Sequence, residues 1–202
     1  MRRPVLVALE GGEGAGKSTQ AVRLAARLDA VLTREPGGTA LGEAVRRLLL
    51  DPAGGPLDAR TEALLFAADR ADHVAGVIEP ALAVGRSVVT DRYVESSLAY
   101  QAFGRGLPLE EVRALSAFAT GGRSADVVVV LDVDPAVGAA RRGRPPDRME
   151  AEDTGFHERV RAGFAALAAA EPGRIAVVDA SGDADEVARL VWAEVEARFP
   201  DR

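Results

Sequence analysis

The pattern of apolar positions along the chain predicts short strands that alternate with helices. Five runs rich in valine, leucine and isoleucine show no polar alternation, which is typical of strands buried on both faces. They lie at residues 5–9, 30–33, 87–90, 127–131 and 175–179. Helical spacing falls between and after them, at about 17–28, 40–50, 58–84, 96–103, 109–119, 156–170 and 183–199, with a short helix from Pro135. This alternation predicts an α/β fold with a parallel sheet of about five strands and helices on both faces.

Proline and glycine mark the places where these elements are interrupted. Pro36-Gly37-Gly38 requires a turn after the second strand, and residues 51–56 are expected to form a loop. The helix at 58–84 is expected to bend near Pro80, because proline removes a backbone hydrogen bond. A basic segment at 141–148 contains two prolines, so it is not expected to be a regular helix.

Length and composition narrow the class of protein. The 202 residues are predicted to form a single domain, residues 1–202, with a substantial core. The absence of cysteine excludes disulfides and thiol chemistry. A formal net charge of −6 argues against nonspecific binding to nucleic acid or to an anionic membrane. The apolar run at 5–9 is too short for a signal peptide or a membrane span, so we expect a cytoplasmic protein.

A glycine-rich stretch follows the first strand and leads into the first helix. Gly11 and Gly16 enclose four residues ahead of Lys17-Ser18, which is the phosphate-binding P-loop pattern. Glycines let backbone N–H groups approach phosphate oxygens, and the helix N-terminus adds partial positive charge. Lys17, the only lysine in the chain, can reach the β- and γ-phosphates, and the Ser18 hydroxyl can bind Mg²⁺. The predicted triphosphate site consists of Gly11, Gly12, Glu13, Gly14, Ala15, Gly16, Lys17, Ser18 and Thr19.

Polar residues end the other predicted strands, at the edge where ligands bind in open parallel sheets. Asp91 can hold Mg²⁺ through water opposite Ser18, or it can cap the following helix. Arg92 can bind a phosphate oxygen, or it can form a surface salt bridge. The full set expected at this edge is Glu10, Thr33, Arg34, Glu35, Asp91, Arg92, Asp132 and Asp134.

A P-loop alone indicates only a nucleoside triphosphate. A GTPase would also need an Asn-Lys-x-Asp motif for guanine, which a chain with one lysine cannot contain. Arginines after the third strand, and a separate arginine cluster late in the chain, instead favour phosphoryl transfer to a second small phosphate compound.

Several motifs, in order along nearly the whole chain, resemble those of the thymidylate kinase family. The most distinctive is Thr33-Arg34-Glu35-Pro36-Gly37-Gly38-Thr39, because no general requirement of the fold produces it. The others are Glu10-Gly11-x-Glu13-Gly14-Ala15-Gly16-Lys17-Ser18-Thr19, Phe66-x-x-Asp69-Arg70-x-x-His73, Asp91-Arg92-Tyr93 with Ser97-x-x-Tyr100-Gln101, and Asp147-Arg148-x-Glu150. The resemblance implies a P-loop nucleoside monophosphate kinase-like fold and transfer of the ATP γ-phosphate to dTMP, with Mg²⁺, to give dTDP.

The resemblance also implies roles in the dTMP site. Phe66 would stack on thymine, and Arg70, one helical turn later, would clamp the dTMP phosphate. Ser97 and Gln101 would read the pyrimidine edge, and Glu13 would face the 3′-hydroxyl of the deoxyribose. Arg34, Glu35, Pro36, Arg92 and Tyr100 complete the expected site. From spacing alone, Phe66 is more readily a core residue. For Tyr100 a polar position on the helix surface, and for Glu35 a turn-stabilising role, remain alternatives to binding.

The basic segment at about 141–150 is expected to act as a lid. The P-loop interior carries no arginine, so positive charge for the transferring phosphoryl group must come from elsewhere, and an arginine finger contributes about 10³–10⁵ in rate. A lid arginine would supply that charge and exclude water. Arg142, Arg144 and Arg148 are the candidates, with Arg144 favoured, beside Lys17 and Arg92 as the other catalytic residues. As a bare run of charge, the segment would instead be a solvated loop.

Two other functions stay open on the sequence alone. A deoxynucleoside kinase would share the P-loop, although its uncharged acceptor would not need Arg70 and Arg92. A regulatory nucleotide-binding protein would bind ATP without forming dTDP. The resemblance further implies a homodimer, for which the alanine- and leucine-rich helix at 61–78 offers a packing face. The expected partners are therefore ATP, dTMP and a second copy of the chain.

Overall fold

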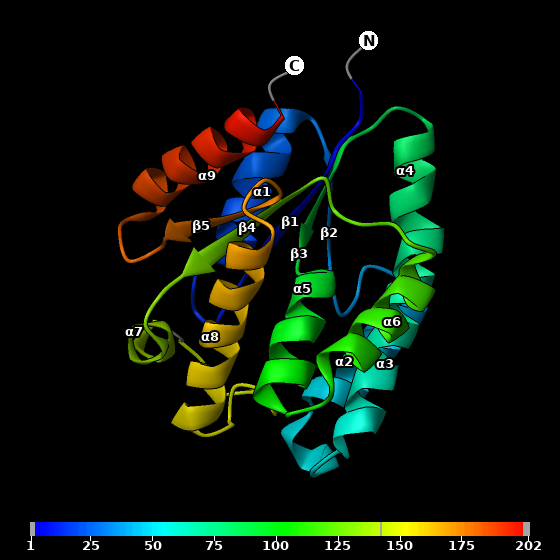
Figure 1. The fold of residues 1–202 in the computed structure, drawn as a ribbon, viewed down its shortest axis with the longest axis vertical. Coiled ribbons are helices and arrows are strands. Elements are labelled where there is room, and N and C mark those ends of the chain that lie inside the picture. Colours follow the sequence, from blue (N-terminus) through cyan, green and yellow to red (C-terminus); the bar gives the residue numbers. More distant parts are fainter. Residues whose placement is uncertain (1–2, 142, 200–202) are drawn as a thin grey trace.

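The computed structural model describes residues 3–141 and 143–199, which form a parallel sheet enclosed by helices (Figure 1). Within these residues the sheet has five strands, in the order β2-β3-β1-β4-β5. Their bounds are Leu6–Gly11 for β1, Val31–Arg34 for β2, Val88–Asp91 for β3, Val127–Asp132 for β4 and Ile175–Asp179 for β5. Each neighbouring pair is parallel, so the predicted α/β sheet is confirmed and its carboxyl ends share one edge.

The helices lie close to the predicted ranges. Two of them, α1 (Lys17–Leu28) and α2 (Ala40–Leu50), have the bounds that the apolar spacing predicts. The others are α3 Ala59–His73, α4 Glu79–Ala83, α5 Val94–Ser97, α6 Leu109–Thr120, α7 Pro135–Ala140, α8 Thr154–Ala170 and α9 Ala184–Arg198. A short 3₁₀ turn, η1 (Pro52–Gly54), lies in the loop after α2.

Two predicted helices contain π-helical segments. The helix expected at 58–84 consists of α3, the π-helix η2 (Val74–Ile78) and α4, so the change in geometry precedes Pro80. The helix expected at 96–103 begins as α5 and continues as the π-helix η3 (Leu98–Gly104). Widened turns of this kind are frequent at functional sites, and hydrophobic spacing does not distinguish them from α-helix.

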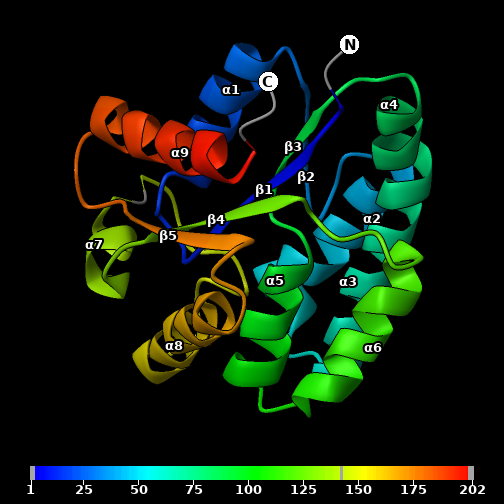
Figure 2. The same cartoon turned by 45° about the horizontal axis from the view of Figure 1, so that its top comes forward.

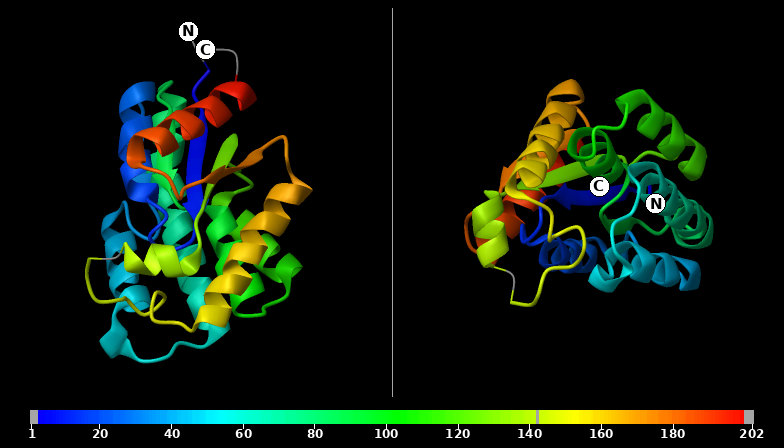
Figure 3. Two further views of the ribbon diagram at one scale, coloured as in Figure 1. Left: turned by 90° about the vertical axis from the view of Figure 1, so that its left-hand side faces the viewer. Right: turned by 90° about the horizontal axis from the view of Figure 1, so that it is seen from below.

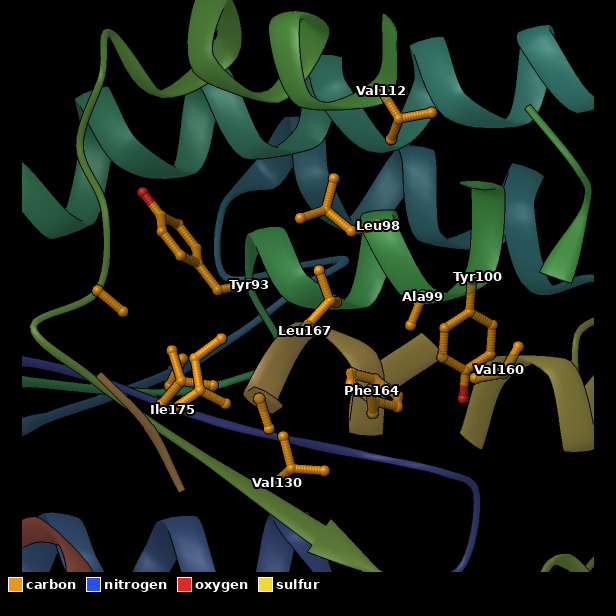
Figure 4. Packing of buried hydrophobic residues seen from close by; sticks show 14 of the residues in the cluster. Tyr93, Leu98, Ala99, Tyr100, Val112, Val130, Val160, Phe164, Leu167 and Ile175 are labelled. Atoms are coloured by element: carbon orange, nitrogen blue, oxygen red, sulfur yellow. The ribbon is translucent and has the colours of Figure 1, made fainter. Parts of the chain in front are cut away.

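The sheet separates two apolar layers, because successive residues of a strand point to opposite faces. On one face, α1 and α9 cover Val7 and Leu9 of β1. On the other face, α5, η3 and α8 cover Leu6 and Ala8 (Figure 2). In this second layer the Tyr100 ring lies beside Val160 and Phe164 (Figure 4). The strands are thus buried on both sides, as their unbroken apolar runs predict.

The carboxyl edge of the sheet is where segments distant in sequence converge. The P-loop connects β1 to α1, and the turn at 35–39 follows β2. The described part of the segment between α7 and α8 crosses this edge (Figure 3) and is fixed to α2 by a bond from Arg148 N to Leu50 O of 3.1 Å. Across residues 3–141 and 143–199, no helix is both long and apolar enough to cross a membrane.

Candidate functional site

A cavity of about 620 Å³ lies at the carboxyl edge of the sheet. It is lined by the P-loop, the ends of β2 and β3, α3, α5, η3, the segment at 143–150 and the start of α9. The expected site residues that the structure brings together here are Glu13, Gly14, Ala15, Gly16, Lys17, Ser18, Thr19, Arg34, Glu35, Pro36, Phe66, Asp91, Arg92, Ser97, Tyr100, Gln101 and Arg144. Gly11 and Gly12 line a smaller cavity of about 220 Å³ behind the P-loop.

The P-loop end of the cavity places a cation beside a pair of hard oxygen groups. Lys17 Nζ donates to Gly12 O at 2.7 Å, and burial lowers the pKa of this lysine. Ser18 Oγ donates to Asp91 Oδ2 at 2.5 Å, so Asp91 faces the P-loop rather than capping α5. A hydroxyl and a carboxylate fit Mg²⁺, which takes few protein ligands and completes its shell with phosphates and water. Consistent with this, the described residues contain no cluster of three or more His, Cys, Asp or Glu able to hold a metal.

Helix α7 packs directly against the backbone of the P-loop. A Cβ atom at Gly14 would lie 2.1 Å from Gly138 O, and a Cβ at Gly138 would lie 2.1 Å from Glu13 O. Gly14 also has a φ of +69°, in the region that favours glycine. Both positions therefore require glycine, and α7 supports the loop that would hold phosphates.

Arg92 lines the cavity and connects the P-loop to η3. Its Nη1 donates to Gly11 O at 3.1 Å and to Ser96 Oγ at 3.0 Å, while Nη2 donates to Glu13 Oε1 at 2.5 Å and to Tyr100 OH at 3.1 Å. Arg92 also has a φ of +74°, a conformation that costs an L-residue energy and is found mostly at functional sites. Burial alone would raise the pKa of Glu13, but the Arg92 guanidinium, with Lys17 and the Tyr100 hydroxyl, holds it at about 2.

The opposite end of the cavity carries an aromatic ring and uncharged polar groups. Phe66 of α3 lines it together with Ser97 and Gln101. Gln101 Nε2 donates to Glu62 Oε1 at 3.0 Å, and Tyr100 OH donates to Glu13 Oε1 at 2.8 Å. The hydroxyl of Tyr100 thus points to the P-loop, whereas the surface position considered from spacing alone is wrong, since this residue is buried.

Arg70, expected to clamp the dTMP phosphate, is directed toward protein oxygens in this structure. All three guanidinium nitrogens already donate to protein oxygens: Glu35 Oε2 at 2.8 Å, Ser97 Oγ at 3.0 Å and Tyr93 O at 2.9 Å. Arg70 is 2% exposed and does not line the cavity. It donates to Ser97 and Glu35, which do line the cavity.

Glu35 reaches the cavity but is held from behind. Its second oxygen contacts His73 Nδ1 at 2.8 Å, and His73 Nε2 contacts Thr33 Oγ1 at 2.6 Å. Together with the Arg70 bond, these contacts fix the turn at 35–39, which agrees with the turn-stabilising role considered for Glu35. The His73 ring is fully buried and therefore structural.

Three carboxylates expected at this edge lie outside the cavity. Asp132 accepts two bonds of 2.7 Å from Arg161 of α8, and Asp134 caps α7 through Ala136 N at 2.9 Å. Glu10 is buried under the loop after β3, where its Oε1 accepts from Tyr93 N and Ser96 N. Each of these carboxylates accepts hydrogen bonds from a neighbouring element. A position at the end of a strand does not indicate such partners.

The structure also brings in residues that sequence motifs did not indicate. Arg46 of α2 lines the cavity, and its Nη1 donates to Pro36 O at 2.9 Å. The loop after β5 and the first turns of α9 also line the cavity. Because this loop follows the carboxyl end of a parallel strand, its position in the sequence could have indicated that it belongs to the site. The further lining residues of this kind are Gln20, Leu50, Ser96, Met149, Ala180, Gly182, Ala184 and Val187. Arg141 of the basic segment and Asp147 and Glu150 of the late motif line the cavity as well.

The arginines of the lid segment have different surroundings. Arg144 lines the cavity, its side chain is 57% exposed, and it forms a two-bond pair with Glu150 at 2.9 and 2.7 Å. Arg148 is buried, donating to Leu49 O at 2.6 Å and Glu62 Oε2 at 2.9 Å, and does not line the cavity. Arg142 lies outside the described residues.

Comparison with known proteins gives a consistent result over nearly the whole chain. Residues 9–191 match the family model described as thymidylate kinase. The thymidylate kinase of Synechococcus sp. (strain JA-3-3Ab) is 54% identical over 200 residues, covering 96% of this chain and 97% of that protein. The thymidylate kinase of Deinococcus radiodurans is 50% identical, covering 98% of this chain and 99% of that protein. The crystal structure of thymidylate kinase from Ehrlichia chaffeensis superimposes with a TM-score of 0.77 at 31% identity, covering 94% of this chain and 97% of that one.

Proposed function

Because this chain belongs to the thymidylate kinase family, whose reaction is the phosphorylation of dTMP to dTDP with ATP, we propose that its central cavity holds both nucleotides together. The supporting observation is that one continuous cavity is lined both by Lys17 and Ser18 of the P-loop and by Phe66 and Gln101. Arg92 lines the same cavity and contacts both the P-loop and Tyr100 of η3, and the two phosphate groups would meet beside it.

The donor would bind with its phosphates on the P-loop. Backbone N–H groups of the loop and the N-terminus of α1 would hold the β- and γ-phosphates, with the Lys17 ammonium moving from Gly12 O to the phosphate oxygens. Ser18 would bind Mg²⁺ directly and Asp91 would bind it through water, and the metal would neutralise charge on these phosphates. The loop at 180–182 and the start of α9 lie at the same end of the cavity and would contact the rest of the donor.

The acceptor would bind with its base against Phe66 and its phosphate toward Arg92. Arg46 lines the cavity as well, so it replaces Arg70 in our assignment of the phosphate ligands. Glu13 Oε1 accepts from Arg92 and Tyr100, whereas Glu13 Oε2 has no hydrogen bond within the described residues. That oxygen remains available to accept from the 3′-hydroxyl of the sugar.

Phosphoryl transfer from this arrangement needs alignment and positive charge more than a general base. Lys17 and Arg92 supply fixed charge, and Arg144 is a lid arginine that lines the cavity. We propose that Arg144 leaves Glu150 and contacts the transferring group when the segment at 141–150 closes as a lid. Closure would also exclude water, which otherwise competes with dTMP as the acceptor.

We also propose a homodimer. Helix α2 packs against α3, and α3 packs against α6 (Figure 2). All three helices carry exposed apolar side chains. They are Leu41, Leu48, Leu64 and Phe118, the last of which is 88% exposed. Sedimentation equilibrium is expected to give twice the 21.1 kDa chain mass, with weaker association for Phe118→Asp. A wild-type mass of one chain would contradict the dimer. The cytoplasmic location expected from the sequence stays a prediction.

The proposed assignment of the acceptor is tested by a coupled assay of ADP release with dTMP, dUMP, UMP, CMP, AMP and thymidine. We expect the highest kcat/KM for dTMP and negligible turnover of thymidine, which offers no phosphate to Arg92 and Arg46. Phe66→Ala should raise the KM for dTMP and leave the KM for ATP unchanged. A preference for thymidine or for any other monophosphate would overturn the assignment.

A further inference from the structure

A buried carboxylate lies behind the base end of the cavity. Glu62 of α3 is 0% exposed and accepts hydrogen bonds from three side chains. Gln101 Nε2 lies 3.0 Å from Glu62 Oε1, Arg105 donates to both carboxylate oxygens at 3.1 and 3.0 Å, and Arg148 donates to Oε2 at 2.9 Å. Paired with two guanidinium groups, this carboxylate offers only acceptors to its neighbours.

The contact with Glu62 determines the orientation of the Gln101 amide. A side-chain amide has a donor end and an acceptor end of nearly the same shape, and turning it over exchanges them. If Gln101 were turned over, its carbonyl oxygen would face the Glu62 carboxylate, and two acceptors would meet in a buried site. That arrangement is strongly unfavourable. Gln101 therefore gives its N–H to Glu62, whichever nucleotide is present.

The consequence is that Gln101 can present its oxygen to the cavity. Gln101 lines the cavity, and within the described residues its Oε1 accepts no hydrogen bond. Thymine and uracil carry a proton on N3, whereas the N3 of cytosine is an acceptor. We propose that Glu62 is a positioning residue that, by orienting Gln101, selects pyrimidine monophosphates with a proton on N3 and rejects those without one.

This inference rests on the proposed function, since it assumes that the base binds beside Phe66 and Gln101. The test compares kcat/KM for dTMP and dCMP in the wild-type enzyme and in Glu62→Gln. The introduced amide can donate or accept, so Gln101 becomes free to turn over and offer its N–H to cytosine N3. We expect the dTMP-to-dCMP ratio to fall at least ~10-fold, which corresponds to about 1.4 kcal/mol. A folded E62Q variant whose ratio stays within about twofold of wild type would overturn the proposal.

Arg105→Gln is the matched control. It removes a half-buried partner of Glu62 and leaves the Gln101 contact in place, so we expect a lower Tm with an unchanged dTMP-to-dCMP ratio. An equal fall of the ratio in R105Q would mean that general loosening, and not the amide orientation, causes the effect. In the exchanged variant E62Q/Q101E, the amide on α3 donates to the carboxylate on η3, which again presents an acceptor to the cavity. The ratio should recover there, and a ratio as low as that of E62Q would count against the proposal.

A measurement on the wild-type protein decides the matter even where E62Q does not fold. Nitrogen-15 NMR with and without dTMP should show the side-chain N–H₂ of Gln101 exchanging slowly with solvent in both states, because Glu62 holds it in both. Rapid exchange, or protection that appears only with dTMP, would overturn the proposal. Absence of dTMP turnover by the wild-type enzyme would instead mark failure of the proposed function.

Discussion

Arg92 Nη2 lies 2.5 Å from Glu13 Oε1, joining the end of β3 to the acidic residue of the P-loop. This pair explains how a phosphate-binding loop can include a carboxylate. The Arg92 guanidinium neutralises the Glu13 carboxylate and lines the cavity. The Arg92 backbone has a φ of +74°, in the left-handed region. One face of the pair can therefore bind phosphate while the other accepts from a sugar hydroxyl.

Replacing Arg92 by lysine keeps the positive charge but removes the planar guanidinium group with its two terminal nitrogens. One ammonium nitrogen cannot reach Gly11 O, Ser96 Oγ, Glu13 and Tyr100 together, as the two guanidinium nitrogens do. We expect kcat/KM for dTMP to fall about 100-fold or more, measured by the coupled assay. Arg86→Lys, at an exposed position, is the control and should behave as wild type. A kcat/KM for dTMP in R92K within about threefold of the wild-type value would contradict this prediction, because charge alone would then account for the role of Arg92.

Because α7 contacts the P-loop backbone, we expect one added methyl group at Gly138 to change both ATP binding and stability. Gly138→Ala places Cβ 2.1 Å from Glu13 O, so the backbone of the loop must move. We expect weaker ATP binding by calorimetry and a free energy of unfolding lower by about 1–3 kcal/mol. Gly173→Ala, where a Cβ would meet nothing within 4 Å, should change neither quantity. Normal ATP affinity in G138A would show that α7 does not support the loop.

The two described candidate lid arginines should separate activity from stability. The Arg144 side chain is mostly exposed, and the carboxylate of its buried partner Glu150 also accepts from Asp147 N. Arg144→Ala should therefore lower Tm less than Arg148→Ala does, and it should lower kcat about 10³-fold. Arg148 is one of two guanidinium partners of the buried Glu62, so Arg148→Ala leaves that carboxylate with Arg105 alone and should lower the free energy of unfolding by about 1–3 kcal/mol. Calorimetry and steady-state kinetics on both variants give the comparison. A large loss of kcat in R148A at unchanged stability would reverse the assignment.

The raised pKa of Glu10 is expected to make the free energy of unfolding depend on pH. Burial, reinforced by the nearby Glu95, raises the pKa of Glu10 from 4.5 to about 8. The folded state therefore holds a proton that the unfolded state releases, so this contribution is complete below about pH 4.5 and is lost as pH rises through about 8. Glu10→Gln mimics the protonated form and should make the free energy of unfolding less dependent on pH between 5 and 8. Equal pH dependence in urea titrations of both proteins would contradict a shifted Glu10.

The sequence was sufficient for the fold because of how the strands are buried. A strand covered on both faces leaves an unbroken apolar run, and β5 lies at the predicted residues 175–179. Helices α1 and α2 were equally clear, since each follows a strong start signal: the P-loop for α1 and Thr39, which caps α2. The π-helical segments were missed, because hydrophobic spacing changes little when a turn widens by one residue.

The candidate site was predicted less completely, because motifs give position and not surroundings. Arg70 was placed on the correct helix, but its three acceptors, which include Glu35, come from other segments. Arg46 belongs to no motif and enters the cavity only because α2 packs on α3. Arg148 differs from Arg144 because it pairs with Glu62, which is 86 residues away in the sequence, so the lid motif could not indicate this contact.

The central claim is that Lys17 and the P-loop transfer a phosphoryl group to dTMP in this cavity. The most direct test follows labelled phosphate from [γ-³²P]ATP into dTDP with the wild-type protein and with Lys17→Ala, after circular dichroism has shown both to be folded. We expect labelled dTDP from the wild type and a rate at least ~100-fold lower from K17A, because the lost ammonium contacts the transferring group and not the core. Equal rates from the two proteins, or no labelled dTDP from the wild type, would contradict the account.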